Sequence, residues 1–93
     1  MNWVNVPLAA GLYLVSTPIG TARDITLRAL DVLASADRLV AEDTRTLKKL
    51  MDIHGVPLSG RRIQSYHDHS RGGERVRIVE AVMAGQSVAY ASE

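Results

Sequence analysis

Glu42-Asp43-Thr44-Arg45 brings two carboxylates, a hydroxyl and a guanidinium together directly after a short apolar run. Glu42 follows the first turn of the chain by about 20 residues, the spacing at which dinucleotide-binding enzymes hold the ribose of their cofactor. Helix-capping acids paired with an arginine would explain the same segment without any chemistry. The residues alone leave both interpretations open.

His67-Asp68-His69 resembles a metal site at first sight. In an extended segment the two imidazoles share one face and the carboxylate lies on the other, which makes an incomplete ligand set, so no metal is predicted. The remaining interpretations are a polar loop and a substrate-facing rim with a histidine available for proton transfer. Five arginines bracket this segment and favour either phosphate contact or a solvated face: Arg61, Arg62, Arg71, Arg75 and Arg77.

A rigid turn, Thr17-Pro18-Ile19-Gly20, follows the first apolar run of the chain. Gly20 would let a ligand approach the backbone, and the amides of a following helix could receive an anionic group. The G-x-G-x-x-G fingerprint of dinucleotide enzymes is missing. The turn therefore indicates either a site for a nucleotide-like cofactor or an ordinary connection between a strand and a helix.

Alternating strands and helices are needed to position these segments, and the apolar pattern predicts them. The expected strands are Gly11–Thr17, buried on both faces, Arg38–Glu42, Arg62–Tyr66 at a sheet edge, and Ser87–Ala91. The first expected helix is Asp24–Ala36, begun by a capping box of Thr21 and Asp24. The second begins at a Thr44 cap and ends at His54-Gly55. The third ends at Gly85 and turns four apolar residues inward: Val76, Val79, Val82 and Met83. Short connections in this order predict an α/β fold, a three-layer αβα arrangement with a mainly parallel sheet.

The composition bounds what one such domain can be. Its 93 residues, 46% hydrophobic and 23% charged, predict a single folded domain, with residues 1–10 as a flexible leader. Cysteine is absent, which excludes disulfides and thiolate metal sites and is compatible with a cytoplasmic location. The net charge of +1 by itself does not predict nucleic-acid binding. No apolar stretch approaches the length that a membrane span needs, so no membrane partner is expected.

Parallel strands collect ligands at their carboxyl ends, where the loops after the four strands would meet. The motifs there resemble, in order, those of the 16S rRNA (cytidine-2'-O)-methyltransferase family, which belongs to the tetrapyrrole methylase superfamily. They are Leu14-Val15-Ser16-Thr17-Pro18-Ile19-Gly20, Asp24-Ile25-Thr26-Leu27-Arg28-Ala29-Leu30, Ala41-Glu42-Asp43-Thr44-Arg45 and Tyr66-His67-Asp68-His69. The resemblance covers about Gly11 to Glu93.

The resemblance implies a two-domain enzyme with S-adenosylmethionine in a cleft between its domains. Residues 11–93 would be the N-terminal domain of the tetrapyrrole methylase fold, truncated, with the C-terminal domain absent. Such an enzyme methylates a cytidine ribose of 16S rRNA in the small ribosomal subunit, and we expect a homodimer for the full-length protein. The chain alone is expected to bind the cofactor weakly or not at all, without turnover.

Individual positions carry over from the family by their motifs. Thr17, Pro18, Ile19 and Gly20 match its first cofactor loop, and Ser92 matches the start of its second. The catalytic candidates are Glu42, Asp43 and His67, and the substrate-side candidates are Arg45, Asp68 and His69. The chain departs from the family at Glu93, where Asp is usual, and at Ser70-Arg71-Gly72-Gly73, where relatives often have Asn-Glu.

Two other functions compete with this hypothesis. A methylase of a tetrapyrrole ring carbon would share the sheet and the cofactor, but it usually has a Gly-x-Gly-Pro-Gly type of first loop, where this chain has Ser-Thr-Pro-Ile-Gly. A non-enzymatic binding module of flavodoxin-like shape would need no second domain and should leave no large apolar surface exposed.

Overall fold

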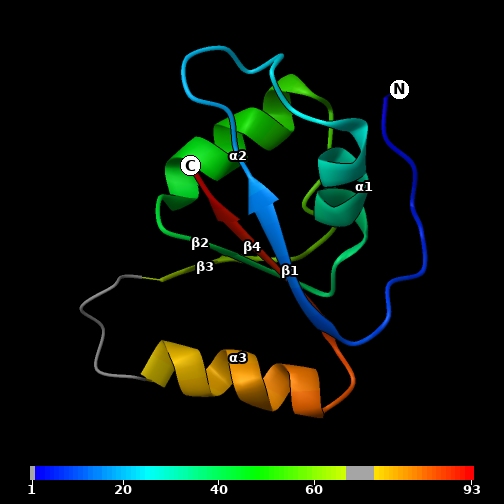
Figure 1. Cartoon of the computed structure of the whole chain (residues 1–93), viewed down its shortest axis with the longest axis vertical. Helices are drawn as coiled ribbons and strands as arrows, with labels where there is room; N and C mark the ends of the chain where they lie inside the picture. The colour runs from blue at the N-terminus through cyan, green and yellow to red at the C-terminus, as the bar shows by residue number, and fades with distance from the viewer. Residues whose placement is uncertain (1, 67–72) are drawn as a thin grey trace.

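Four parallel strands form one sheet between two helical layers in the computed structural model of the chain, which describes residues 2–66 and 73–93. The elements in chain order are β1 (Gly11–Ser16), α1 (Leu27–Ser35), β2 (Arg38–Ala41), α2 (Thr44–Ile53), β3 (Ile63–Ser65), α3 (Gly73–Met83) and β4 (Ser87–Ser92). Helices α1 and α2 cover one face of the sheet, and α3 covers the other (Figure 1). The expected three-layer α/β architecture is confirmed.

The strand order is β1-β4-β2-β3, with every neighbouring pair parallel. The chain moves across the sheet from β1 to β2 and then to β3, and it returns to place β4 between β1 and β2. Because crossovers between parallel strands are right-handed, reversing the direction of travel moves the connecting helix to the opposite face. This is why α3 lies apart from α1 and α2. The order also differs from the 2-1-3-4-5 order of flavodoxin-like folds.

The two faces of the sheet carry two apolar clusters. The larger cluster joins β2 and β4 to the inner sides of α1 and α2, including Leu33, Leu39, Leu47 and Met51. The smaller one joins Val40, Val88 and Ala81 under α3. Strands β2 and β4 are therefore the buried centre of the fold. Packing on both faces holds these two strands in place, so their ends can position a site.

Helix α1 begins three residues later than expected. Its N-cap is Thr26, whose hydroxyl accepts a hydrogen bond from the amide of Ala29 at 3.0 Å. The predicted capping box of Thr21 and Asp24 is wrong, because the hydroxyl of Thr21 instead accepts from the amide of Arg23 and the carbonyl of Thr21 accepts from the amide of Asp24. These local bonds close a turn before the helix.

Strand β1 was expected to be buried on both faces, and this is wrong. It lies at the edge of the sheet and pairs only with β4. Val15 packs into the larger cluster, but Leu14 on the other face is 77% exposed and Leu12 is also exposed. The α3 layer packs mainly on β4 and leaves this face of β1 uncovered.

Helix α3 faces the sheet with a different side from the one predicted. Ile78, Ala81 and Val82 pack against the smaller cluster, while Val76, Val79 and Met83 are exposed. Only Val82 of the expected inner stripe lies inward. The buried position belongs to Ala81, because its small side chain lets the helix approach Val88 of β4.

The other expected elements differ by one or two residues at their ends. Strand β2 ends at Ala41, so Glu42 lies in the following loop, and β4 continues to Ser92. Strand β3 is the expected edge strand, shortened to Ile63–Ser65. The segment before β1 contacts the helical layer: the indole of Trp3 donates to the carbonyl of Gly55, and the amide of Val6 donates to the hydroxyl oxygen of Ser35. The flexibility of residues 1–10 stays a prediction.

In the part of the chain that the structure describes, no helix has the length and apolar character needed to cross a bilayer.

Candidate functional site

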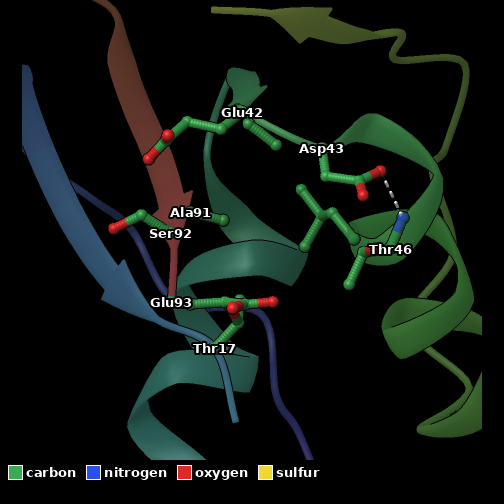
Figure 2. A pocket seen from close by; sticks show the side chains of 9 residues that line it. Thr17, Glu42, Asp43, Thr46, Ala91, Ser92 and Glu93 are labelled. Carbon is green, nitrogen blue, oxygen red and sulfur yellow. Dashed lines mark hydrogen bonds between the residues drawn. The ribbon is translucent and has the colours of Figure 1, made fainter. Parts of the chain in front are cut away.

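The carboxyl ends of β1, β2 and β4 surround a hollow of about 400 Å³ (Figure 2). The parallel register explains why they meet: Ser16 pairs with Ser92 and Ala41 with Ala91, so all three strands end at the same level. The amide of Thr17 donates to the carbonyl of Ser92 at 2.8 Å and joins the first loop to the last residues of β4. We call this the acidic hollow, lined by Thr17, Ala41, Glu42, Asp43, Thr46, Leu47, Ala91, Ser92 and Glu93.

Three carboxylates line the acidic hollow, from Glu42, Asp43 and Glu93, and no cationic side chain is among its lining residues in the described chain. Figure 2 shows the side chain of Glu42 extending toward β4, whereas that of Asp43 turns toward α2. The two adjacent acids therefore have different surroundings. A hollow of this charge suits a ligand that carries positive charge.

Asp43 is the N-cap of α2, a role that the sequence had suggested for Thr44. Its Oδ1 accepts hydrogen bonds from the amides of Arg45 and Thr46, both at 3.1 Å. The amide of Thr46 is the main cause that holds the pKa of the Asp43 carboxyl below its usual value; the hydroxyl of Thr46 and the amide and charge of Arg45 also lower it. A carboxylate stabilised in this way is a poor proton acceptor.

The pKa of Asp43 leads to a pH-dependent prediction. Because this pKa is lowered on folding, the cap stabilises the fold above the unfolded value of about 3.8 and is lost as the pH falls through the lower folded value. Asp43→Ala should lower the melting temperature by a constant amount between pH 7 and pH 5, and by progressively less below about 3.8. Circular dichroism melts of both proteins measure this difference.

Thr44→Ala is the matched control for Asp43→Ala, since it alters the neighbouring residue and leaves the capping carboxylate in place. It should change the melting temperature much less at every pH. The melting temperatures of Asp43→Ala and the unaltered chain should not approach each other between pH 7 and pH 5. If they did, the assignment of Asp43 as the cap would be contradicted.

A second hollow of about 440 Å³ lies beside the first, between the loop after β1 and helix α2. We call it the lysine hollow, lined by Thr17, Pro18, Gly20, Thr21, Ala22, Thr46, Lys49, Leu50 and Ile53. Thr17 and Thr46 line both hollows. Nε2 of His54, at the end of α2, lies 2.6 Å from the carbonyl oxygen of Ala22, so this ring nitrogen donates and ties the loop to the helix.

The structure gathers most of the expected site residues at one end of the sheet. Thr17, Glu42, Asp43 and Ser92 line the acidic hollow. Pro18 and Gly20 line the lysine hollow beside it, and Gly20 has a φ of +94°, a left-handed conformation that glycine adopts without strain.

The remaining candidates lie outside both hollows or outside the described residues. Ile19 is 78% exposed, and Arg45 lies on the first turn of α2 without lining either hollow. His67, Asp68 and His69 fall in the segment 67–72, outside the described residues. Among residues 2–66 and 73–93, no group of three or more histidine, aspartate or glutamate side chains is arranged to hold a metal ion.

Helix α2 contributes site residues that sequence reasoning missed. Thr46, Lys49, Leu50 and Ile53 follow the i, i+3, i+4, i+7 spacing of one helical face, and this face lines the lysine hollow. The spacing was a signal available in the sequence. The sequence does not show that this face lines a site, because Leu50 also fits the apolar core stripe of the helix. The loop that forms the opposite wall is also distant in the chain.

Residues 11–93 match the family model described as Tetrapyrrole (Corrin/Porphyrin) Methylases. The chain therefore belongs to the tetrapyrrole methylase family, and the class expected from its four motifs is confirmed.

The most informative relatives share one name, ribosomal RNA small subunit methyltransferase I. The protein of that name from Mesorhizobium japonicum is 47% identical over 87 residues, which are 94% of this chain and 29% of the relative. Those from Bacillus subtilis and Escherichia coli O157:H7 are 40% and 38% identical, each over 82 residues, which are 88% of this chain and 27% and 28% of the relatives. The chain thus spans less than a third of the length of these curated relatives.

Proposed function

We propose that this chain forms one side of the active site of an S-adenosylmethionine-dependent methyltransferase that acts on ribosomal RNA. The specific reaction would be methylation of the ribose 2'-oxygen of a cytidine in 16S rRNA, within the small ribosomal subunit. The names of the relatives support ribosomal RNA of the small subunit as the substrate class. The single structural observation behind the proposal is the acidic hollow at the carboxyl ends of β1, β2 and β4.

The residues of the acidic hollow fit the cofactor by charge and by hydrogen-bonding groups. S-adenosylmethionine supplies a methyl group bound to a positively charged sulfur, and it also carries an ammonium group and ribose hydroxyls. Three carboxylates favour such a cation, and the hydroxyls of Thr17 and Ser92 provide further polar partners. We assign cofactor binding to Thr17 and Ser92, which line the acidic hollow. Pro18, Ile19 and Gly20, the other positions expected to bind the cofactor, continue the same loop outside this hollow.

Proton removal from the ribose 2'-hydroxyl is the step for which this chain offers a base. Glu42 is favoured over Asp43, because the carboxylate of Asp43 is engaged by two amides and its pKa is lowered by those bonds. Glu42 lines the hollow and extends toward Ser92 (Figure 2). His67 remains a further candidate base, and Arg45, Asp68 and His69 are proposed on the substrate side.

The complete enzyme would require more protein than this chain contains, as the length of the relatives suggests. The proposal includes a second α/β domain over the acidic hollow, a homodimer and a cytoplasmic location. This chain alone should then bind the cofactor weakly and should not turn over, because it contributes only one wall of the site.

Transfer of a labelled methyl group tests the proposal. The full-length protein, incubated with methyl-labelled S-adenosylmethionine and small subunits that lack the modification, should label the RNA at one cytidine. The adjacent phosphodiester should then resist alkaline hydrolysis, because a 2'-O-methyl group blocks the attack that cleaves it. A porphyrinoid substrate is the control for the broader family. Label in the porphyrinoid and none in RNA would overturn the proposed function.

A further inference from the structure

The two hollows differ in charge although they adjoin. The acidic hollow has three carboxylates in its lining, and the lysine hollow has one ammonium group, from Lys49, and no acid among its described lining residues. They meet at Thr17 and Thr46. A cation and an anion that must react with each other would therefore be drawn to neighbouring positions in this molecule.

Lys49 is available to a ligand. The single ion pair within the described part of the chain joins Lys48 to Asp52 at 3.2 Å, on the exposed side of α2. Lys49 follows Lys48 along the helix and has no acidic partner among the described residues. Its ammonium group is a point charge with three donors, which suits a phosphate oxygen.

The rest of the lysine hollow combines apolar and polar walls. Leu50 is buried at its base, and Ile53 is 56% exposed at its side. Thr21 and Thr46 add hydroxyl groups, and the hydrogen bond between His54 and Ala22 holds the loop wall against α2. One cation, several hydroxyls and an apolar wall in a hollow of about 440 Å³ match a nucleotide, which has an anionic phosphate, a ribose and a flat apolar base.

We propose that the lysine hollow binds the target nucleotide of the RNA, with its phosphate at Lys49 and its base or ribose against Leu50 and Ile53. This inference rests on the proposed function. The carboxylates of the acidic hollow repel an RNA phosphate and attract the methyl donor, so charge separates the two ligands. The ribose hydroxyl then reaches the methyl group across the boundary at Thr17 and Thr46. Both threonines become positioning residues for the reaction.

Adjacent lysines on α2 allow a matched test in the full-length protein. Lys49→Gln should raise KM for unmodified small subunits about tenfold, the loss expected for one charge-assisted hydrogen bond to phosphate. It should leave kcat and the Kd for S-adenosylmethionine within about twofold. The dependence of log KM on log salt concentration should become shallower by about 0.7, since one RNA phosphate is no longer neutralised. Lys49→Arg should restore most of the affinity.

Lys48→Gln removes the same charge one residue away and should change neither KM nor the salt dependence, because that lysine lies in the pair with Asp52. If Lys49→Gln instead raised the Kd for S-adenosylmethionine and left KM for RNA unchanged, the lysine hollow would hold part of the cofactor and the inference would be wrong. Equal effects of the two substitutions would also overturn it. Failure of the unaltered protein to methylate small subunits would refute the proposed function, a result distinct from either of these.

Discussion

Replacing Glu42 with glutamine is expected to lower kcat for methyl transfer by about a hundredfold, the usual contribution of a general base. The amide has nearly the shape of the carboxylate but cannot accept the proton of the ribose hydroxyl. The residue is exposed in the loop after β2 and lines the acidic hollow, so its replacement should not disturb the core. Single-turnover transfer from labelled S-adenosylmethionine to unmodified small subunits measures the effect.

Measuring kcat and the Kd for the cofactor separately distinguishes a base from a residue that only holds the cofactor. If Glu42 is the base, Glu42→Gln should lower kcat and leave the Kd for S-adenosylmethionine within about twofold of that of the unaltered protein. Glu80→Gln, an exposed substitution on α3, is the control for a change of one charge and should leave the rate unaltered. A Glu42→Gln enzyme with a normal kcat and only a raised Kd for the cofactor would assign the carboxylate to binding.

Arg61→Met is expected to have the largest effect on stability, lowering the free energy of unfolding by about 3 kcal/mol. The guanidinium donates to four carbonyl oxygens: from Nε to Leu58 at 2.6 Å, from Nη1 to Leu33 at 2.7 Å and Ala36 at 2.9 Å, and from Nη2 to Pro57 at 2.8 Å. Two of these carbonyls lie at the end of α1, where a cation is favourable. Burial lowers the pKa of Arg61, but arginine stays charged at neutral pH.

Urea denaturation of the chain, followed by circular dichroism, measures this loss. Arg62→Met, at the adjacent exposed arginine, is the matched control and should change the stability by less than about 0.5 kcal/mol. Arg61→Lys keeps the charge but cannot reach four oxygens at once, so it should recover less than half of the loss. Equal stabilities for Arg61→Met and Arg62→Met would show that the four hydrogen bonds contribute nothing.

Much of the site could be predicted from the chain because parallel strands end at a common edge. Short apolar runs located the strands, and the residues after them, including Thr17, Glu42, Asp43 and Ser92, were expected to meet there. The acidic hollow confirms that meeting, while the roles of these residues stay predictions. Which of the two adjacent acids is free depended on hydrogen bonds at the start of α2, and these were not evident from the residue types.

The sequence by itself determined the alternation of strands and helices, because the spacing of apolar residues reflects the repeat of each element. Tertiary structure decided the rest. The insertion of β4 between β1 and β2 moved β1 to an edge, and the close packing of Ala81 turned Val76 and Val79 outward. The loop after β1 also meets α2 across the lysine hollow, so Gly20 and Lys49 line the same hollow although they are nearly thirty positions apart in the chain. Contacts between segments so far apart follow from the order of the strands, which no local pattern records.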